Sequence, residues 1–395
     1  MKSSPANGRS LSVAGLFAGI GGIERGLRDS GHHAALLCEI DDGASRVLSH
    51  RFSDVPLVRD VRELKRLPDV DVVAAGFPCQ DLSQAGRTAG IGGSNSGLVG
   101  HVFRLLDSRK KWPTWLLLEN VSFMLQLDRG RGMRFLVDEL EARGYSWAYR
   151  VVDTQAFGLP QRRQRVVLLA SKSDDPREVL FADDAEPQLP SFSRELWCGF
   201  YWTEGLRGLG WAVDAVPTLK GGSTIGIPSP PAIWNPKADA IFTPDIRDAE
   251  RLQGFPAGWT EQALEGSGVR PGHRWKLVGN AVSVPMATWV GRRLAKPGTF
   301  DEARLAETVR AGVSWPRAAC GGPGREPRQV AVSMWPVRCK RVHLSKFLEH
   351  PTKPLSHRAA AGFLERANEG NLRFEDGFID AVGRHVDAMR TKVVA

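Results

Sequence analysis

The sequence has few cysteines and no long apolar run. Its five cysteines are odd in number and widely scattered along 395 residues, which fits neither a disulfide framework nor a close-paired metal site. We therefore expect reduced thiols. No stretch of about 18 uncharged apolar residues occurs, and residues 1–10 lack the apolar stretch of a secretory signal. We expect a soluble, cytoplasmic protein.

Acidic residues are also fewer than basic ones. The chain has 53 Lys and Arg against 44 Asp and Glu, a formal net charge of +9. A basic balance favours a polyanionic partner such as nucleic acid, because neutralised phosphates dominate the affinity for nucleic acids. Solubility alone would also explain the charge.

Short apolar runs alternate with amphipathic segments in the first half of the chain. Residues 11–17 are typical of a buried strand, residues 18–22 of a glycine-rich turn and residues 23–29 of a helix. Further apolar runs follow at residues 34–38, 70–75, 114–118 and 166–170. This alternation predicts an α/β fold: a doubly wound, mainly parallel, Rossmann-like sheet with helices on both faces.

Shifts in composition divide the rest of the chain. We expect a catalytic and cofactor-binding domain over residues 1–172 and a smaller, loop-rich domain over 173–243, which is dense in Gly, Pro and Trp. Residues 244–295 would return to complete the first domain. Residues 296–395 would form a basic and helical C-terminal extension of unknown role, for which a DNA-contacting module and a dimer-forming cap are the alternatives.

The glycine-rich turn contains Gly19, Gly21 and Gly22, where backbone can approach a ligand closely. A second strand ends in Glu39, where doubly wound folds place an acid on ribose hydroxyls. A further acid, Asp60, follows residues 57–59. The turn departs from the G-x-G-x-x-G dinucleotide pattern. A cofactor without phosphates, such as S-adenosylmethionine, fits better, and a purely structural turn is the alternative.

Two apolar strands deliver reactive side chains at their ends. Cys79 follows Pro78 after the strand at 70–75, and Glu119 ends the strand at 114–118. Because open α/β sheets bind ligands beyond the carboxyl ends of their strands, a nucleophile and an acid could face one substrate. The alternative for Cys79 is a buried structural cysteine.

Two further segments fit such a site. The glycine-rich segment 83–100 is typical of a lid, with a disordered surface loop as the alternative. Alternation along the next strand would send Arg163 and Arg165 to one face and Arg162 to the other. Paired guanidiniums suit a phosphate or a carbonyl oxygen, and a solvated charge run is the alternative.

Taken in order, these motifs resemble those of the DNA (cytosine-5) methyltransferases, over about three quarters of the chain (residues 11–294). The matching elements are the Phe-x-Gly-x-Gly turn at 17–21, Glu39, Asp60, Pro78-Cys79-Gln80, Glu119-Asn120-Val121, the Gln-x-Arg-x-Arg run at 161–165, the Arg-Leu-Gln-Gly-Phe-Pro segment at 251–256, and Gly279-Asn280-Ala281-Val282.

The resemblance implies a mechanism. Cys79 would add to carbon 6 of a cytosine and so activate carbon 5 towards the methyl group of S-adenosylmethionine. Glu119 would hold a proton at ring nitrogen 3, Arg165 would bind the ring carbonyl oxygen, and Arg163 would help to hold the site or a phosphate. The target base would be flipped out of duplex DNA.

The resemblance also implies binding residues. Those for the cofactor are Phe17, Ala18, Gly19, Gly21, Gly22, Glu39, Ile40, Asp60, Val61, Pro78, Asn280 and Val282; those for DNA recognition are Gln80, Ser83, Thr218 and Leu219.

The implied partner is double-stranded DNA, with neither a metal nor a membrane. The enzyme would be a monomer of the bacterial or phage restriction-modification type, with a cognate restriction endonuclease, or of the solitary type. Methylation of tRNA cytosine by the same scaffold, and a non-catalytic DNA-recognition protein that binds the cofactor, are the rival functions.

Overall fold

The computed structural model describes residues 9–77, 97–109, 111–221, 228–266, 270, 272–310 and 312–394. The chain forms two compact units. Unit 1 consists of Met1–Ala156, Gln164–Pro187 and Val282–Arg338, and unit 2 of Phe157–Arg163, Gln188–Ala281 and Cys339–Ala395. Among the residues placed by the structure, no helix is long and apolar enough to cross a membrane.

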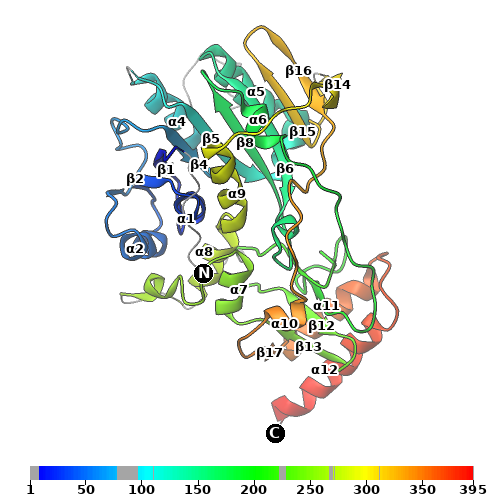
Figure 1. The fold of residues 1–395 in the computed structure, drawn as a ribbon. Helices are drawn as coiled ribbons and strands as arrows, with labels where there is room; N and C mark the ends of the chain where they lie inside the picture. Colours follow the sequence, from blue (N-terminus) through cyan, green and yellow to red (C-terminus); the bar gives the residue numbers. More distant parts are fainter. Residues whose placement is uncertain are drawn as a thin grey trace. The chain divides into compact units, whose positions relative to one another are not determined.

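Unit 1 is built on one large sheet (Figure 1). In the described chain its strand order is β14-β16-β15-β6-β8-β5-β4-β1-β2-β3. The half from β5 to β3 is parallel, whereas β8 pairs antiparallel with both β5 and β6, and β15 continues antiparallel beyond β6. The strands are β1 Ser12–Leu16, β2 His33–Cys38, β3 Leu57–Val58, β4 Val72–Ala75, β5 Trp115–Val121, β6 Ser146–Asp153, β8 Gln164–Ser171, β14 Leu305–Thr308, β15 Ala318–Gly322 and β16 Arg325–Val330.

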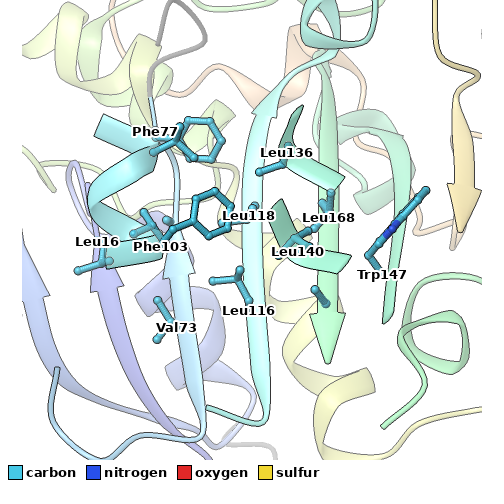
Figure 2. Close-up of a cluster of buried hydrophobic side chains, with 14 of the residues drawn as sticks. Leu16, Val73, Phe77, Phe103, Leu116, Leu118, Leu136, Leu140, Trp147 and Leu168 are labelled. Atoms are coloured by element: carbon cyan, nitrogen blue, oxygen red, sulfur yellow. The ribbon is translucent and has the colours of Figure 1, made fainter. Parts of the chain in front are cut away.

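Helices cover both faces of the parallel half, as the apolar runs predict. Leu16 and Leu116 point into a core with Phe103 and Leu136, which come from two helices on that face (Figure 2). Gly15, one position along β1, faces the opposite side and lies against Glu24 of another helix. The helices of unit 1 are α1 Gly22–Asp29, α2 Asp42–Arg51, α4 Leu98–Asp107, α5 Arg131–Ala142, α6 Pro176–Leu180 and α9 Val284–Ala295, with short 3-10 turns η1 Ser122–Leu125, η2 Leu127–Gly130, η3 Thr154–Phe157, which runs into unit 2, and η5 Glu302–Arg304.

The returning helix α9 packs closely on α1. A Cβ atom on Gly26 would lie 2.5 Å from Cβ of Ala287, and one on Gly22 would lie 2.4 Å from the carbonyl oxygen of Val282. Only glycine at these two positions allows so close an approach. This contact brings the chain around residue 282 back beside the first turn of the fold.

Unit 2 has shorter strands and an aromatic core. Its main sheet has the order β10-β9-β12-β13-β17, and β11 pairs with β7 in a separate ribbon. Phe200 and Trp234 of the sheet pack against Phe363 and Phe378 of the last two helices. The elements are β7 Gln161–Arg162, β9 Cys198–Phe200, β10 Ala212–Val213, β11 Val216–Pro217, β12 Ala232–Asn235, β13 Ala240–Thr243, β17 Lys353–Pro354, α7 Ile246–Leu252, η4 Glu261–Leu264, α8 His273–Asn280, α10 Leu344–Phe347, α11 His357–Glu369 and α12 Phe378–Val394.

These units divide the chain differently from the expected boundaries. Residues 296–395 do not form one extension: β14 to β16 lengthen the sheet of unit 1, and residues 339–395 belong to unit 2. The cause is pairing over long sequence distances, since β15 joins β6 and the two terminal helices bury their aromatic side chains against β9 and β12. Residues 244–281, expected in the returning segment, also belong to unit 2, and only the chain from Val282 onwards belongs to unit 1.

Candidate active site

The turn after β1 has an unusual backbone. Phe17 adopts φ of 56°, Gly19 a φ of 56° and Gly21, the N-cap of α1, a φ of 82°. A side chain at Gly21 would be strained and would also lie 2.5 Å from the ring of Phe52, so glycine is needed there. Left-handed Phe17 is rare for a bulky residue and marks a site where backbone strain serves a purpose. The turn presents backbone groups rather than side chains.

Glu39 follows β2 and is bonded to this turn. Its Oε2 accepts a hydrogen bond of 2.7 Å from the amide of Gly19, and its Oε1 accepts one of 2.8 Å from the amide of Asp41. The side chain is buried, and burial raises the pKa of the carboxyl above its usual range. Each oxygen keeps a second lone pair, so the group can still accept hydrogen bonds from a pair of hydroxyls.

Ile40, Asp60 and Val61 lie near the ends of β2 and β3. Ile40 is 60% exposed, which is unusual for a large apolar residue, whereas Val61 is buried. Asp60 forms an ion pair of 2.5 Å with Arg62, whose hydrogen bonds lower the pKa of Asp60 to about 2. Asp60 is therefore an ionised acceptor at neutral pH.

Glu119 and Arg165 meet where β5 and β8 pair. Arg165 stands opposite Val121 and Glu119 opposite Val167, so the two side chains come from neighbouring positions of adjacent strands. Nε of Arg165 lies 3.1 Å from Oε1 of Glu119, and both side chains are about nine-tenths buried. A buried carboxyl beside a guanidinium is a suitable group for holding a proton and orienting a polar ring.

The ends of β4 and β5 are tied together beside this pair. The side-chain amide of Asn120 donates a hydrogen bond of 3.0 Å to the carbonyl of Phe77. A Cβ atom on Gly76 would lie 3.6 Å from Oε2 of Glu119 and 3.9 Å from Cγ2 of Val282, so these residues converge. Phe77 packs into the core above Phe103 (Figure 2). The chain therefore leaves β4 at a fixed point next to the carboxylate of Glu119.

Arg163 is placed in unit 2 and has a different environment from Arg165. It is buried, and its guanidinium donates to the carbonyls of Leu219 (3.3 Å), Gly279 (3.2 Å) and Ala281 (2.7 Å). Arg162, by contrast, is exposed, as strand alternation predicts. Arg163 holds three backbone segments of unit 2 in place.

The remaining expected residues are divided between the units. Val282 lies in unit 1 beside Gly22, as expected for a residue near the first turn. Asn280 is in unit 2 at the end of α8; a Cβ on Gly221 would lie 2.7 Å from its Oδ1. Asn280 and Val282 flank the break between two helices, because α8 ends at Asn280 and α9 begins at Val284.

Thr218 and Leu219 follow β11. The hydroxyl of Thr218 donates to the carbonyl of Arg162 (2.9 Å), and the amide of Leu219 donates to the side chain of Gln161 (3.1 Å). Gln161 is fully buried and also donates to the carbonyl of Leu252 (2.7 Å). The Thr-Leu segment is therefore anchored to the Gln-x-Arg run.

Several expected residues lie outside the described part of the chain: Pro78, Cys79, Gln80 and Ser83, with nearly all of the expected lid. The four described cysteines, Cys38, Cys198, Cys320 and Cys339, are free thiols, and Cys339 is exposed.

Glu24 is a buried carboxyl that the sequence motifs do not indicate. It is 3% exposed beside Gly15, and burial raises its pKa to about 7. An indicator was present, because Glu24 stands between the apolar positions Ile23 and Leu27 in the helix that follows the glycine turn. The anchoring hydrogen bonds of Asn120 and Gln161 are likewise not indicated by any local sequence pattern.

Comparison with known proteins gives concordant results. Residues 11–196 match the family model described as C-5 cytosine-specific DNA methylase. The chain is 48% identical over 396 residues to the Type II methyltransferase M2.BsuMI of Bacillus subtilis (strain 168), covering 97% of this chain and all of the relative. It is 38% identical over 169 residues to the Type II methyltransferase M.BsuFI of Bacillus subtilis, covering 42% of this chain and 41% of that relative.

The fold is also found among solved structures. The crystal structure of the S. pombe Dnmt2 methyltransferase aligns with a TM-score of 0.52 at 17% identity, covering 72% of this chain and 97% of that chain. This likeness supports the α/β fold class expected from the sequence.

Proposed function

Because this chain belongs to the C-5 cytosine-specific DNA methylase family, we propose that it methylates carbon 5 of a cytosine flipped out of duplex DNA through a covalent adduct with Cys79. The observation that carries the assignment of residues is the buried Glu119–Arg165 pair, 3.1 Å apart, at the ends of two neighbouring strands. Asn120, next to Glu119, bonds the carbonyl of Phe77, two residues before Cys79.

The chemistry requires a nucleophile, because carbon 5 of a neutral pyrimidine ring reacts poorly with an electrophile. The Cys79 thiolate forms a bond to carbon 6, and the displaced ring electrons make carbon 5 nucleophilic. After carbon 5 gains its methyl group, a base removes the carbon-5 proton, and the electrons of that bond expel the thiolate. Cys79 is thus regenerated in each cycle.

Glu119 and Arg165 act on the polar edge of the ring. A carboxyl that holds a proton at ring nitrogen 3 draws electrons from carbon 6 and favours attack by the thiolate. Burial of Glu119 supports this role, and the neighbouring guanidinium of Arg165 can donate to the ring carbonyl oxygen. Their ion pair keeps both groups oriented before the base arrives.

The first turn and the strand-end acids fit S-adenosylmethionine. The bound cofactor would supply a methyl group on a sulfonium sulfur, which makes that carbon electrophilic. Glu39 has two oxygens available for ribose hydroxyls, and the glycines at 19 and 21 allow backbone to contact the methionine portion. Exposed Ile40 offers an apolar surface, and ionised Asp60 can accept a hydrogen bond from the adenine amine.

Duplex DNA is the proposed macromolecular substrate, and the similarity to type II methyltransferases favours a restriction-modification role with a cognate endonuclease. We expect a monomer acting in the cytoplasm.

Covalent trapping tests this function. A mixed library of duplexes carrying 5-fluorocytosine is incubated with S-adenosylmethionine, and denaturant-stable protein–DNA complexes are resolved by electrophoresis. Fluorine cannot leave carbon 5 as a proton does, so the adduct persists. Wild-type protein and Cys339→Ser, which removes an exposed thiol, should form the complex, and Cys79→Ser should not. No adduct with wild type, an equal adduct with Cys79→Ser, or preferential methylation of tRNA would contradict the proposal.

A further inference from the structure

Residues 339–354, which begin the C-terminal part of unit 2, are here called the strap. It carries four Lys and Arg residues against one acid, Glu349. It contains little regular structure, only α10 and the short strand β17. Its position is nevertheless fixed by two buried aspartates of unit 2.

Asp214 holds the first part of the strap. Its side chain is 1% exposed and accepts hydrogen bonds from the guanidinium of Arg341 (2.9 Å), Nδ1 of His343 (2.8 Å) and the amide of Leu344 (2.9 Å). A buried carboxylate with three donors is well satisfied, so this end of the strap is held firmly.

Asp248 holds the second part in the same way. It is fully buried and accepts from the amides of Glu349 (3.2 Å) and His350 (2.9 Å) and from Nδ1 of His350 (3.0 Å). Arg251 bridges Asp248 and Glu349, at 2.8 Å and 2.5 Å. The only acid of the strap is therefore neutralised by a partner.

The lysines of the strap remain in solvent. Lys340 and Lys346 are exposed, and neither forms an ion pair with any residue that the structure describes. The strap backbone at Lys340 packs on the segment that carries the Gln-x-Arg run, since a Cβ on Gly158 would lie 2.9 Å from the carbonyl oxygen of Lys340. That segment continues to exposed Arg162, whose carbonyl binds Thr218.

We propose that the strap is a phosphate-binding element of the DNA-recognition unit, in which Lys340 and Lys346 contact the sugar-phosphate backbone beside the Thr218–Leu219 segment. The proposal rests on the proposed function for its partner, duplex DNA. An anchored strap fits this role because its backbone loses little conformational freedom on binding. Contacts to phosphates position a duplex and carry no base information.

The test is the salt dependence of duplex binding by the full-length protein. Dissociation constants of wild type and Lys340→Gln/Lys346→Gln are measured between low and moderate salt on duplexes of mixed sequence. Each lost phosphate contact lowers the slope of log K against log salt by about 0.9, so the double variant should lose about 1.8. At low salt its affinity should fall about tenfold, and equally for any sequence.

A matched control separates the loss of local phosphate contacts from the loss of net positive charge. Arg358→Gln/Arg373→Gln removes the same charge from exposed positions of unit 2, on α11 and in the loop before α12, and should leave the slope unchanged. An unchanged slope in the strap variant, or an equal loss in the control, overturns the proposal. If the wild type binds duplex DNA and forms the 5-fluorocytosine adduct while the strap variant keeps its slope, only the strap proposal fails. If the wild type does neither, the proposed function fails as well.

Discussion

Buried charged groups are used differently in the two units. In unit 1 the charges at the sheet edge, such as Glu119 and Arg165, pair with each other and remain next to the ends of strands. In unit 2 the buried charges of Arg163 and Asp214 bind backbone groups of distant segments, and Glu250 binds amides of the turn that follows its own helix. A long sheet positions side chains by its register, whereas a unit with very short strands needs buried polar groups to fix its loops. Under the proposed function, the buried charges at the strand ends of unit 1 serve the chemistry, whereas those of unit 2, like Arg150 in unit 1, hold backbone segments in place.

If buried charges serve chemistry at the strand ends of unit 1, Glu119→Gln should have the largest effect of all, and that effect should be on the rate of methylation. The amide cannot give a proton to ring nitrogen 3, so the methylation rate should fall roughly a thousandfold. The free energy of unfolding should also fall, by about 3 kcal/mol or less, because the buried guanidinium of Arg165 loses its charged partner. Single-turnover methylation and urea titration measure the two quantities. Exposed Glu307→Gln is the control; a variant within tenfold of the wild-type rate would remove Glu119 from the chemistry.

In unit 2 we expect Phe378→Ala to act on stability. The centroid of its ring lies 4.9 Å from that of Phe200 and 5.3 Å from that of Trp234. Truncation therefore leaves a cavity and should lower the free energy of unfolding by about 4 kcal/mol. Urea unfolding followed by tryptophan fluorescence reports on this cluster. Exposed Val342→Ala should cost little by comparison. A loss below about 1 kcal/mol for Phe378→Ala would mean that the C-terminal helices are not part of the core of unit 2.

Glu250→Gln tests the structural use of buried charge. Glu250 is fully buried and accepts from the amides of Gly258 (2.6 Å) and Thr260 (2.8 Å) and from Arg274 (2.9 Å). Leaving Arg274 without its partner should cost about 3 kcal/mol. The turnover of folded enzyme on saturating DNA should stay within about twofold of wild type. The comparison between the units breaks down if turnover falls while stability does not; exposed Glu265→Gln is the matched control.

Glu24 is a buried carboxyl of unit 1 that lies outside the Glu119–Arg165 pair, and it gives the smallest predicted effect. Its Oε2 is buried and accepts no hydrogen bond from the described residues, and the nearby carboxylate of Glu39 adds to the burial that raises its pKa from 4.5 to about 7. A raised carboxyl pKa means that the folded state binds more protons than the unfolded state between these values, so stability falls as pH rises through that window. Between pH 5 and pH 8 the wild type should lose about 2 kcal/mol relative to Glu24→Gln.

Unfolding by urea at several pH values checks this difference. Parallel pH curves for wild type and Glu24→Gln would contradict a buried, proton-binding Glu24. Exposed Glu63→Gln should follow the wild type throughout.

The parallel half of unit 1 was predictable because its strands are apolar and end in turns or acids. The turn at Gly19 to Gly21, Glu39 and Glu119 were all found as strand-end residues. β6 was missed because Arg150 interrupts its apolar pattern; the side chain is fully buried and donates to the carbonyls of Ser333 (2.8 Å), Leu180 (3.1 Å) and Asp183 (2.6 Å). These partners lie far from Arg150 in the sequence, so no local pattern predicts that its side chain is buried.

The strands of unit 2 and some contacts of the candidate site could not be predicted from the sequence for a related reason. Strands such as β10, β11 and β17 have two residues each, too few to show periodicity. The pairing of Arg62 with Asp60 and the bond from Asn120 to Phe77 depend on side-chain geometry rather than on residue order. The roles of Arg163 and Arg165 could not be separated from their alternation alone, since both are buried and only their partners differ.

Under the proposed function, the assembly of unit 2 from three separate stretches of chain limits how its DNA specificity can be engineered. A graft that replaced only residues 188–281 would place a foreign sheet against Phe363 and Phe378. It would also remove Asp214 and Asp248 and so leave their donors in the strap without acceptors. Such chimaeras should misfold or lose affinity even when the transplanted loops are correct. Residues 157–163 and 339–395 must therefore be transferred together with residues 188–281.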